Sequence, residues 1–216
     1  VITIRTRHSL NGVMNFKNDN ITENIKKGYF DTFLAFGKYV STWYYITQDA
    51  GKYTPHFTRE DLDMLCRNAA FGEILSKEGL MLKLLSEINE FRDADGLISV
   101  KSPEFFTACL EMLAEIAGID YFEEYTLERF YQCILEELEQ IQRQESYMEG
   151  VKEYLTDKFE NRDFAPDNED KKLILTALLK APQRAETAFD MLFRFAPRIA
   201  VAYFTALVLL ARENTN

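Results

Sequence analysis

Apolar residues recur every three or four positions over most of the chain, which is the spacing of one face of an α-helix. The first such series begins after Thr22 and comprises Ile25, Tyr29, Phe33, Phe36, Val40 and Tyr44. It marks one face of a long helix that continues as far as Tyr44. Comparable patterns predict further helices from Thr58, over about 74–91, over 102–118, from Thr126, over 167–180, from Pro182 and from Pro197.

Residues that favour helix ends stand at several of these boundaries. Thr58-Arg59-Glu60-Asp61 has the spacing of a capping box, in which the first and last side chains bind each other's backbone N–H groups. Ser102-Pro103-Glu104 places serine at an N-cap and proline at the first helical position. Gly118 predicts the end of that helix, and Asp167 predicts the start of another.

The segment from Thr126 has the longest regular pattern. Its apolar residues fall at seven-residue intervals, at Leu127, Ile134, Ile141, Met148 and Leu155. A dimeric coiled coil needs a second apolar position in each repeat, and Glu145 and Lys152 interrupt that series. The pattern therefore favours packing within the protein's own bundle over a coiled-coil dimer, and it leaves self-association open.

The segment Ile199–Ala211 is apolar on every side. A helix without a polar face lies in a protein core or in lipid. Its 13 residues would make a helix of about 20 Å, shorter than the roughly 30 Å of a bilayer's hydrocarbon core. We therefore expect a central core helix and no membrane span.

Residues 1–16 are the one stretch with a β-like pattern. Val1-Ile2-Thr3-Ile4 is rich in β-branched residues, and Asn11-Gly12 favours the tight turn of a hairpin. An isolated hairpin is marginally stable, so this arm should pack on its own domain, pair with a partner's sheet edge or remain loose. The first option is favoured.

The predicted fold is all-α, a multi-helix globular bundle of about seven or eight helices with a short N-terminal β-hairpin arm. We expect three regions: the arm at 1–20, a helical domain at 21–160, and C-terminal helices at 161–216 that pack into the same core.

Composition excludes some classes of function. The chain has 216 residues, of which 47% are hydrophobic, and a formal charge of −10, which argues against a nucleic-acid partner. Its three cysteines are Cys66, Cys109 and Cys133, whose wide spacing suggests neither a zinc site nor a disulfide framework. Free cysteines are typical of a reducing compartment, so we expect a cytoplasmic protein, and no motif indicates a cofactor.

Two acidic turns suggest a cation site. Asp93-Ala94-Asp95-Gly96 precedes Glu104, and Asp49-Ala50-Gly51 precedes Glu60 at the same interval. Carboxylates that converge from such turns can bind a hard cation, and Asp93, Asp95 and Glu104 are the candidate ligands. The spacing does not fit an EF-hand, because glycine stands at the fourth position instead of the sixth. The alternative is that these residues form turns and cap helices.

The stretch Asp95-Gly96-Leu97-Ile98-Ser99 with Glu104 resembles the acidic loops of the helical TerB-type domains of tellurite resistance. The resemblance covers at most residues 40–120. Glu104 lies too far along the chain for that pattern, so the resemblance identifies no family.

Aromatic residues crowd the first predicted helix and its end. Because they surround more than one face, they cannot all point into one core. Tyrosine and tryptophan are enriched at protein interfaces, so Tyr39, Trp43, Tyr44 and Tyr45 are candidate partner-binding residues. The alternative is a helix buried between two layers.

Catalytic motifs are missing from the sequence. Neither His8 nor His56 lies near a nucleophile motif, and there is no phosphate-binding loop. We therefore predict a non-catalytic, regulatory helical protein whose partner is another protein. A domain that binds a cation or small ligand through its acidic loops is the first alternative. An enzyme whose site is assembled from distant segments is the second.

Overall fold

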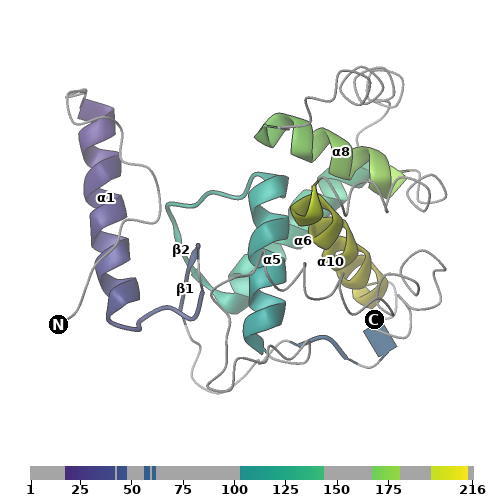
Figure 1. Cartoon of the computed structure of the whole chain (residues 1–216), viewed down its shortest axis with the longest axis horizontal. Coiled ribbons are helices and arrows are strands. Elements are labelled where there is room, and N and C mark those ends of the chain that lie inside the picture. The colour runs from purple at the N-terminus through teal and green to yellow at the C-terminus, as the bar shows by residue number, and fades with distance from the viewer. Residues whose placement is uncertain are drawn as a thin grey trace. The chain divides into compact units, whose positions relative to one another are not determined.

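Helices dominate the part of the chain that the computed structural model describes, which comprises residues 18–41, 43–47, 56–58, 60–61, 103–143, 167–180 and 196–213. These ranges contain five α-helices and one pair of short parallel strands (Figure 1). The prediction of a mostly helical protein is confirmed. The number of helices in these ranges is five, not seven or eight. The helices predicted over about 74–91 and from Pro182 lie outside them.

The described residues belong to two units. The first takes its residues from Val1–Tyr53 and Asp120–Phe130, and the second from Thr54–Ile119 and Tyr131–Asn216. Helix α1 (Asn18–Ala35) and strands β1 (Tyr45–Thr47) and β2 (Glu124–Thr126) are in the first unit. Helices α5 (Pro103–Ala117), α8 (Asn168–Lys180) and α10 (Pro197–Glu213) are in the second. Helix α6 (Leu127–Arg143) begins in the first and continues in the second.

Helix α1 ends at Ala35, so the prediction of one helix as far as Tyr44 is wrong. Gly37 has a φ of 73°, a left-handed conformation that glycine adopts without steric cost and that ends a helix. The Lys38 N–H donates to the Phe33 carbonyl at 3.0 Å, which closes the last turn. The apolar residues between Ala35 and Tyr44 therefore keep the helical spacing by chance, because the helix has already ended.

The sheet joins segments far apart in sequence. Strand β1 pairs in parallel with β2, and Tyr45 lies opposite Glu124. Confining β structure to residues 1–16 was therefore wrong, because three-residue strands are too short to show an alternating pattern. The sheet in the described residues is parallel and is not a hairpin. The predicted N-terminal hairpin lies outside the described residues.

Helix α5 has the predicted start at Pro103, and Gly118 follows its last residue. Gly118 has a φ of 90°, its N–H donates to the Glu115 carbonyl at 3.3 Å, and the Ile119 N–H donates to the Ala114 carbonyl at 3.0 Å. These two bonds form a Schellman motif, which satisfies carbonyls that the helix end leaves without partners. The glycine signal in the sequence is confirmed.

Helix α6 starts where its apolar pattern begins, and α8 starts at the cap predicted at Asp167. The Arg129 N–H donates to Thr126 Oγ1 at 3.1 Å at the start of α6. Before α8, the Asp170 N–H donates to Asp167 Oδ1 at 2.9 Å, and the Asp167 N–H donates to Asp170 Oδ2 at 3.2 Å. Along α6 the seven-residue series is buried as far as it is described, at Leu127, Ile134 and Ile141. Met148 and Leu155 lie outside the described residues.

The core of the second unit lies where α5, α8 and α10 pack against one another (Figure 1). Helix α10 begins at Pro197 and buries residues on several sides, including Ile199, Tyr203 and Leu209. This burial confirms the prediction that the segment forms a core helix. Among the helices that the structure describes, none is both long enough and apolar enough to cross a membrane.

Ion pairs fix α8 at two points of the second unit. Lys172 Nζ lies 2.6 Å from Glu137 Oε1 on α6, and Lys171 Nζ lies 3.7 Å from Glu115 Oε1 on α5. Glu115 also accepts a hydrogen bond from the Arg198 guanidinium on α10. Neighbouring lysines on α8 thus contact carboxylates on two different helices.

Candidate functional site

An apolar face of α1 is turned to solvent. The exposed fractions are 67% for Ile25, 55% for Tyr29 and 65% for Phe36, and Ile21 and Val40 are exposed to a smaller degree. Ile21, Ile25 and Tyr29 follow one another at four-residue steps, so they lie along one side of the helix. Phe36 and Val40 follow the last residue of α1. We call Ile21, Ile25, Tyr29, Phe36 and Val40 together the α1 apolar face. Exposed apolar residues are common singly, but three of them along one side of a helix are more often part of a binding surface.

The opposite side of α1 is buried and includes charged residues. Lys27 and Asp31, each 3% exposed, lie one turn apart on this side. The Lys27 ammonium stands 5.1 Å from the centre of the Phe122 ring, and the Tyr45 hydroxyl lies 3.3 Å from Asp31 Oδ1. Lys27 and Asp31 therefore face inwards on this helix, whereas Ile25 and Tyr29 face outwards. Ile25, Tyr29 and Phe36 belong to the apolar series found in the sequence, and in the structure they are exposed.

Aromatic stacking provides the partners of the buried side. The Phe30 ring stacks on Tyr45 with centroids 4.4 Å apart, and Tyr39 packs beside Tyr45 at 5.5 Å. Aromatic pairs in such arrangements contribute about 0.5–1.5 kcal/mol each beyond the area they bury. These contacts let α1 lie with its polar residues inwards, because Phe30 and the tyrosines bury apolar area on the same side.

The candidate partner-binding residues mostly belong to this packed layer. Tyr39, Tyr44 and Tyr45 are buried, and Trp43 is half-buried. Tyr44 stacks on Tyr121 with centroids 4.5 Å apart. Whether any of the four contacts a partner stays a prediction. The structure buries the three tyrosines, and two of them, Tyr39 and Tyr45, pack against Phe30 of α1.

A polar group at the end of α1 fixes the helix to β2. Lys38 Nζ and the Tyr39 hydroxyl lie 2.6 Å and 2.7 Å from the same oxygen, Glu124 Oε2. Hydrogen bonds from Lys38 and Tyr39 lower the pKa of Glu124. Burial and the hydrogen bond to Glu124 raise the pKa of the Tyr39 phenol. Glu124 is therefore a carboxylate and Tyr39 a neutral donor at neutral pH, which is the combination that this contact needs.

Hydrogen bonds to Asp120 hold the turn that precedes β2 in the first unit. The Tyr125 hydroxyl donates to the Asp120 carbonyl at 2.9 Å, and the Phe122 N–H donates to Asp120 Oδ1 at 2.8 Å. These bonds hold the segment 120–125, which places the Phe122 ring over the Lys27 ammonium. The position of α1 is thus set by a loop about 90 residues further along the chain.

The predicted cation site is not tested by the structure. Asp93 and Asp95 lie outside the described residues, and of Glu104 only the backbone, in the first turn of α5, is described. Within the described ranges, no three histidine, cysteine or carboxylate side chains are grouped so that they could hold a metal ion. Glu60, the acid that follows the first acidic turn, is exposed.

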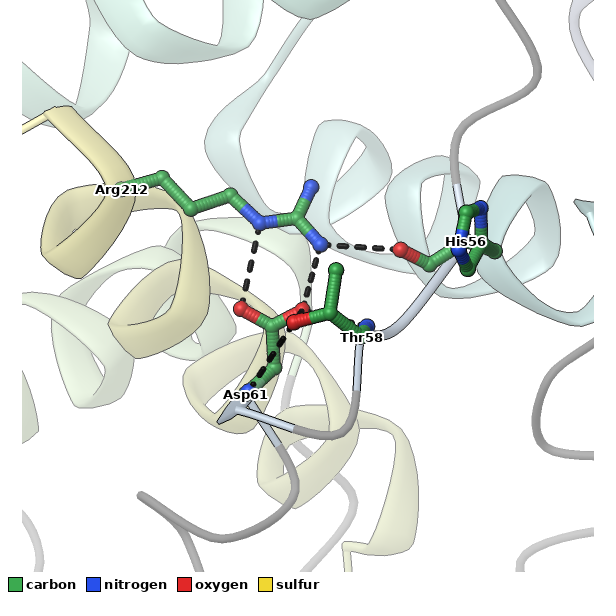
Figure 2. A network of polar contacts seen from close by, with 4 residues as sticks. All are labelled: His56, Thr58, Asp61 and Arg212. Atoms are coloured by element: carbon green, nitrogen blue, oxygen red, sulfur yellow. Dashed lines mark hydrogen bonds and ion pairs between the residues drawn. The ribbon is translucent and has the colours of Figure 1, made fainter. Parts of the chain in front are cut away.

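The second unit contains a polar network that the sequence indicated only in part (Figure 2). Thr58 and Asp61 form the predicted capping box: the Thr58 N–H donates to Asp61 Oδ2 at 2.6 Å, and the Asp61 N–H donates to Thr58 Oγ1 at 3.2 Å. Arg212 at the end of α10 donates to both oxygens of Asp61, at 3.2 Å and 2.5 Å. It also donates to the His56 carbonyl at 2.9 Å.

The chemistry of this network is structural. Burial alone would raise the pKa of Asp61, but hydrogen bonds from Arg212 and Thr58 lower it below its ordinary value. A carboxylate held charged by an arginine has little tendency to accept a proton from a substrate. The nearby Phe57 ring packs against Phe106 and Phe204, with centroids 4.8 Å and 5.3 Å away. The network therefore holds residues 56–61 against α5 and α10.

Two cysteines of the second unit are free thiols. Cys109 is fully buried in α5, and this burial raises the pKa of its thiol even though Thr205 hydrogen-bonds to it. A buried thiol with a raised pKa is a poor nucleophile. Cys133 on α6 is half-buried. Cys66 lies outside the described residues.

The α1 apolar face has one recognisable signal in the sequence, namely that aromatic residues surround α1 on more than one side. That signal predicts that some of them are not in the core, but it does not say which.

Comparison of the chain with protein families, with curated protein sequences and with solved structures gives no match.

Proposed function

We propose that the protein is a non-catalytic binding protein, regulatory in role, whose partner is another protein that contacts the α1 apolar face. The observation that carries the proposal is the exposure of Ile25 and Tyr29 on α1, and of Phe36 just after it, while the charged Lys27 and Asp31 of the same helix are buried. An amphipathic helix presents such anchors, three or four residues apart, to an apolar groove of a partner. The buried thiol of Cys109 supports a reducing compartment such as the cytoplasm.

The dimensions of the face fit this mode of binding. From Ile21 to Phe36 the row covers about 22 Å at the helical rise of 1.5 Å per residue. Its exposed apolar area is on the order of 400–500 Å², given aromatic side chains of about 150–250 Å² and smaller aliphatic ones. That is about the size of the largest apolar patch on a typical monomer, which is often functional, and it is smaller than the roughly 800 Å² per partner of a standard interface. A groove that surrounds the helix would add the missing area.

The test is quantitative capture from lysate of the native source with three baits. These are the wild-type chain, the double variant Ile25→Asp with Tyr29→Asp, and the control Lys26→Asp. Lys26 is an exposed neighbour of Ile25, so the control adds an acid to the same helix outside the face. We expect specific proteins to remain with the control and to fall by about tenfold or more with the double variant, because two carboxylates in an apolar contact cost several kcal/mol.

The substitutions should leave the fold intact, since exposed positions usually change stability by about 0.5 kcal/mol or less. A thermal melt and far-ultraviolet circular dichroism check this for each bait. Each captured protein is then purified and titrated against the three baits. Equal capture and equal affinity for wild type and double variant would exclude the α1 apolar face as the binding surface.

A further inference from the structure

We draw no further inference here: the strongest candidate, the α1 apolar face, belongs to the site already described, and nothing in the structure shows what covers it.

Discussion

Replacing Asp61 by asparagine should destabilise the second unit, because the Asp61 carboxylate takes part in two separate sets of hydrogen bonds. It accepts hydrogen bonds from Thr58 in the capping box, and it accepts two from Arg212 at the end of α10. Asparagine has nearly the same shape, but its amide nitrogen is a donor. At one of the two positions a donor would then face the Arg212 guanidinium, which also donates.

The size of the effect follows from the burial of the pair. Side-chain exposure is 9% for Asp61 and 21% for Arg212. Exposed ion pairs contribute about 0.2–1 kcal/mol, whereas removing one partner of a fully buried pair costs about 3–5 kcal/mol. Because Arg212 retains some access to water, the expected loss lies between these limits, at about 2 kcal/mol. Part of the guanidinium also lies over the Phe106 ring, 5.1 Å from its centre, and that contact remains.

The assay is urea unfolding at pH 7, followed by far-ultraviolet circular dichroism, with a double-mutant cycle of Asp61→Asn and Arg212→Met. We expect a coupling energy of about 1–2 kcal/mol between the two positions. Glu60→Gln is the matched control, since it removes the same charge one residue earlier at an exposed position, and it should change stability by less than about 0.5 kcal/mol. A coupling energy near zero, or equal effects of D61N and E60Q, would refute the reasoning.

The same variant tests the pKa of Asp61. The hydrogen bonds lower this pKa in the folded state, so the folded protein keeps the proton off more strongly than the unfolded chain. The stabilisation is therefore complete above the unfolded pKa of about 3.9 and is lost as pH falls through the folded pKa. The difference in unfolding free energy between wild type and D61N should be constant from neutral pH to about pH 5 and should shrink below about pH 4. A difference that grows on acidification would contradict the direction of the shift.

Three further predictions concern separate features. Gly118→Ala should lower the free energy of unfolding by about 1 kcal/mol, because alanine rarely adopts the positive φ of this position. The added Cβ would not clash, since it would lie 3.7 Å from Lys172 Nζ. Urea unfolding measures the loss, and an unchanged midpoint would contradict the left-handed conformation. Leu209→Ala should cost about 2–5 kcal/mol, because Leu209 is fully buried in α10; a loss below about 1 kcal/mol would contradict its place in the core. If the acidic turns bind a cation, calcium should raise the melting temperature of the wild type and not that of Asp93→Ala with Asp95→Ala; no rise in the wild type with any divalent ion tested would exclude that alternative.

Local chemistry at helix ends was predictable from the sequence, because each end depends on a few adjacent residues. Thr58 with Asp61, Thr126, Asp167 and Gly118 all act as their residue types indicate. The buried series on α6 was also predictable as far as it is described. In these places one short stretch of chain supplies both partners of the interaction.

Contacts between distant segments were not predictable. Strand β1 pairs with a segment nearly 80 residues away, and neither strand is long enough to show a period. The Arg212 contact with Asp61 joins residues 151 positions apart. Sequence patterns state which side chains need partners, but they do not say which distant group provides one.

The side of α1 that faces inwards illustrates the same limit. Apolar spacing puts Ile25 and Tyr29 on one face of the helix, yet the buried contact is the stack of Phe30 on Tyr45 on the other side. A helix with apolar residues on two sides has two candidate buried faces, and the tertiary partners decide between them. Here the partners are aromatic rings of β1 and its flanking loop.

This arrangement bears on how α1 would bind. A helix that orders only on binding loses conformational entropy at that moment, which weakens its affinity. On its buried side α1 is held by the Phe30–Tyr45 stack, and its end is held by Lys38 on Glu124. The exposed anchors Tyr29 and Phe36 are aromatic, so each has few rotatable bonds to immobilise. The buried charges and the aromatic layer behind α1 thus hold an apolar surface in place before any partner packs on it.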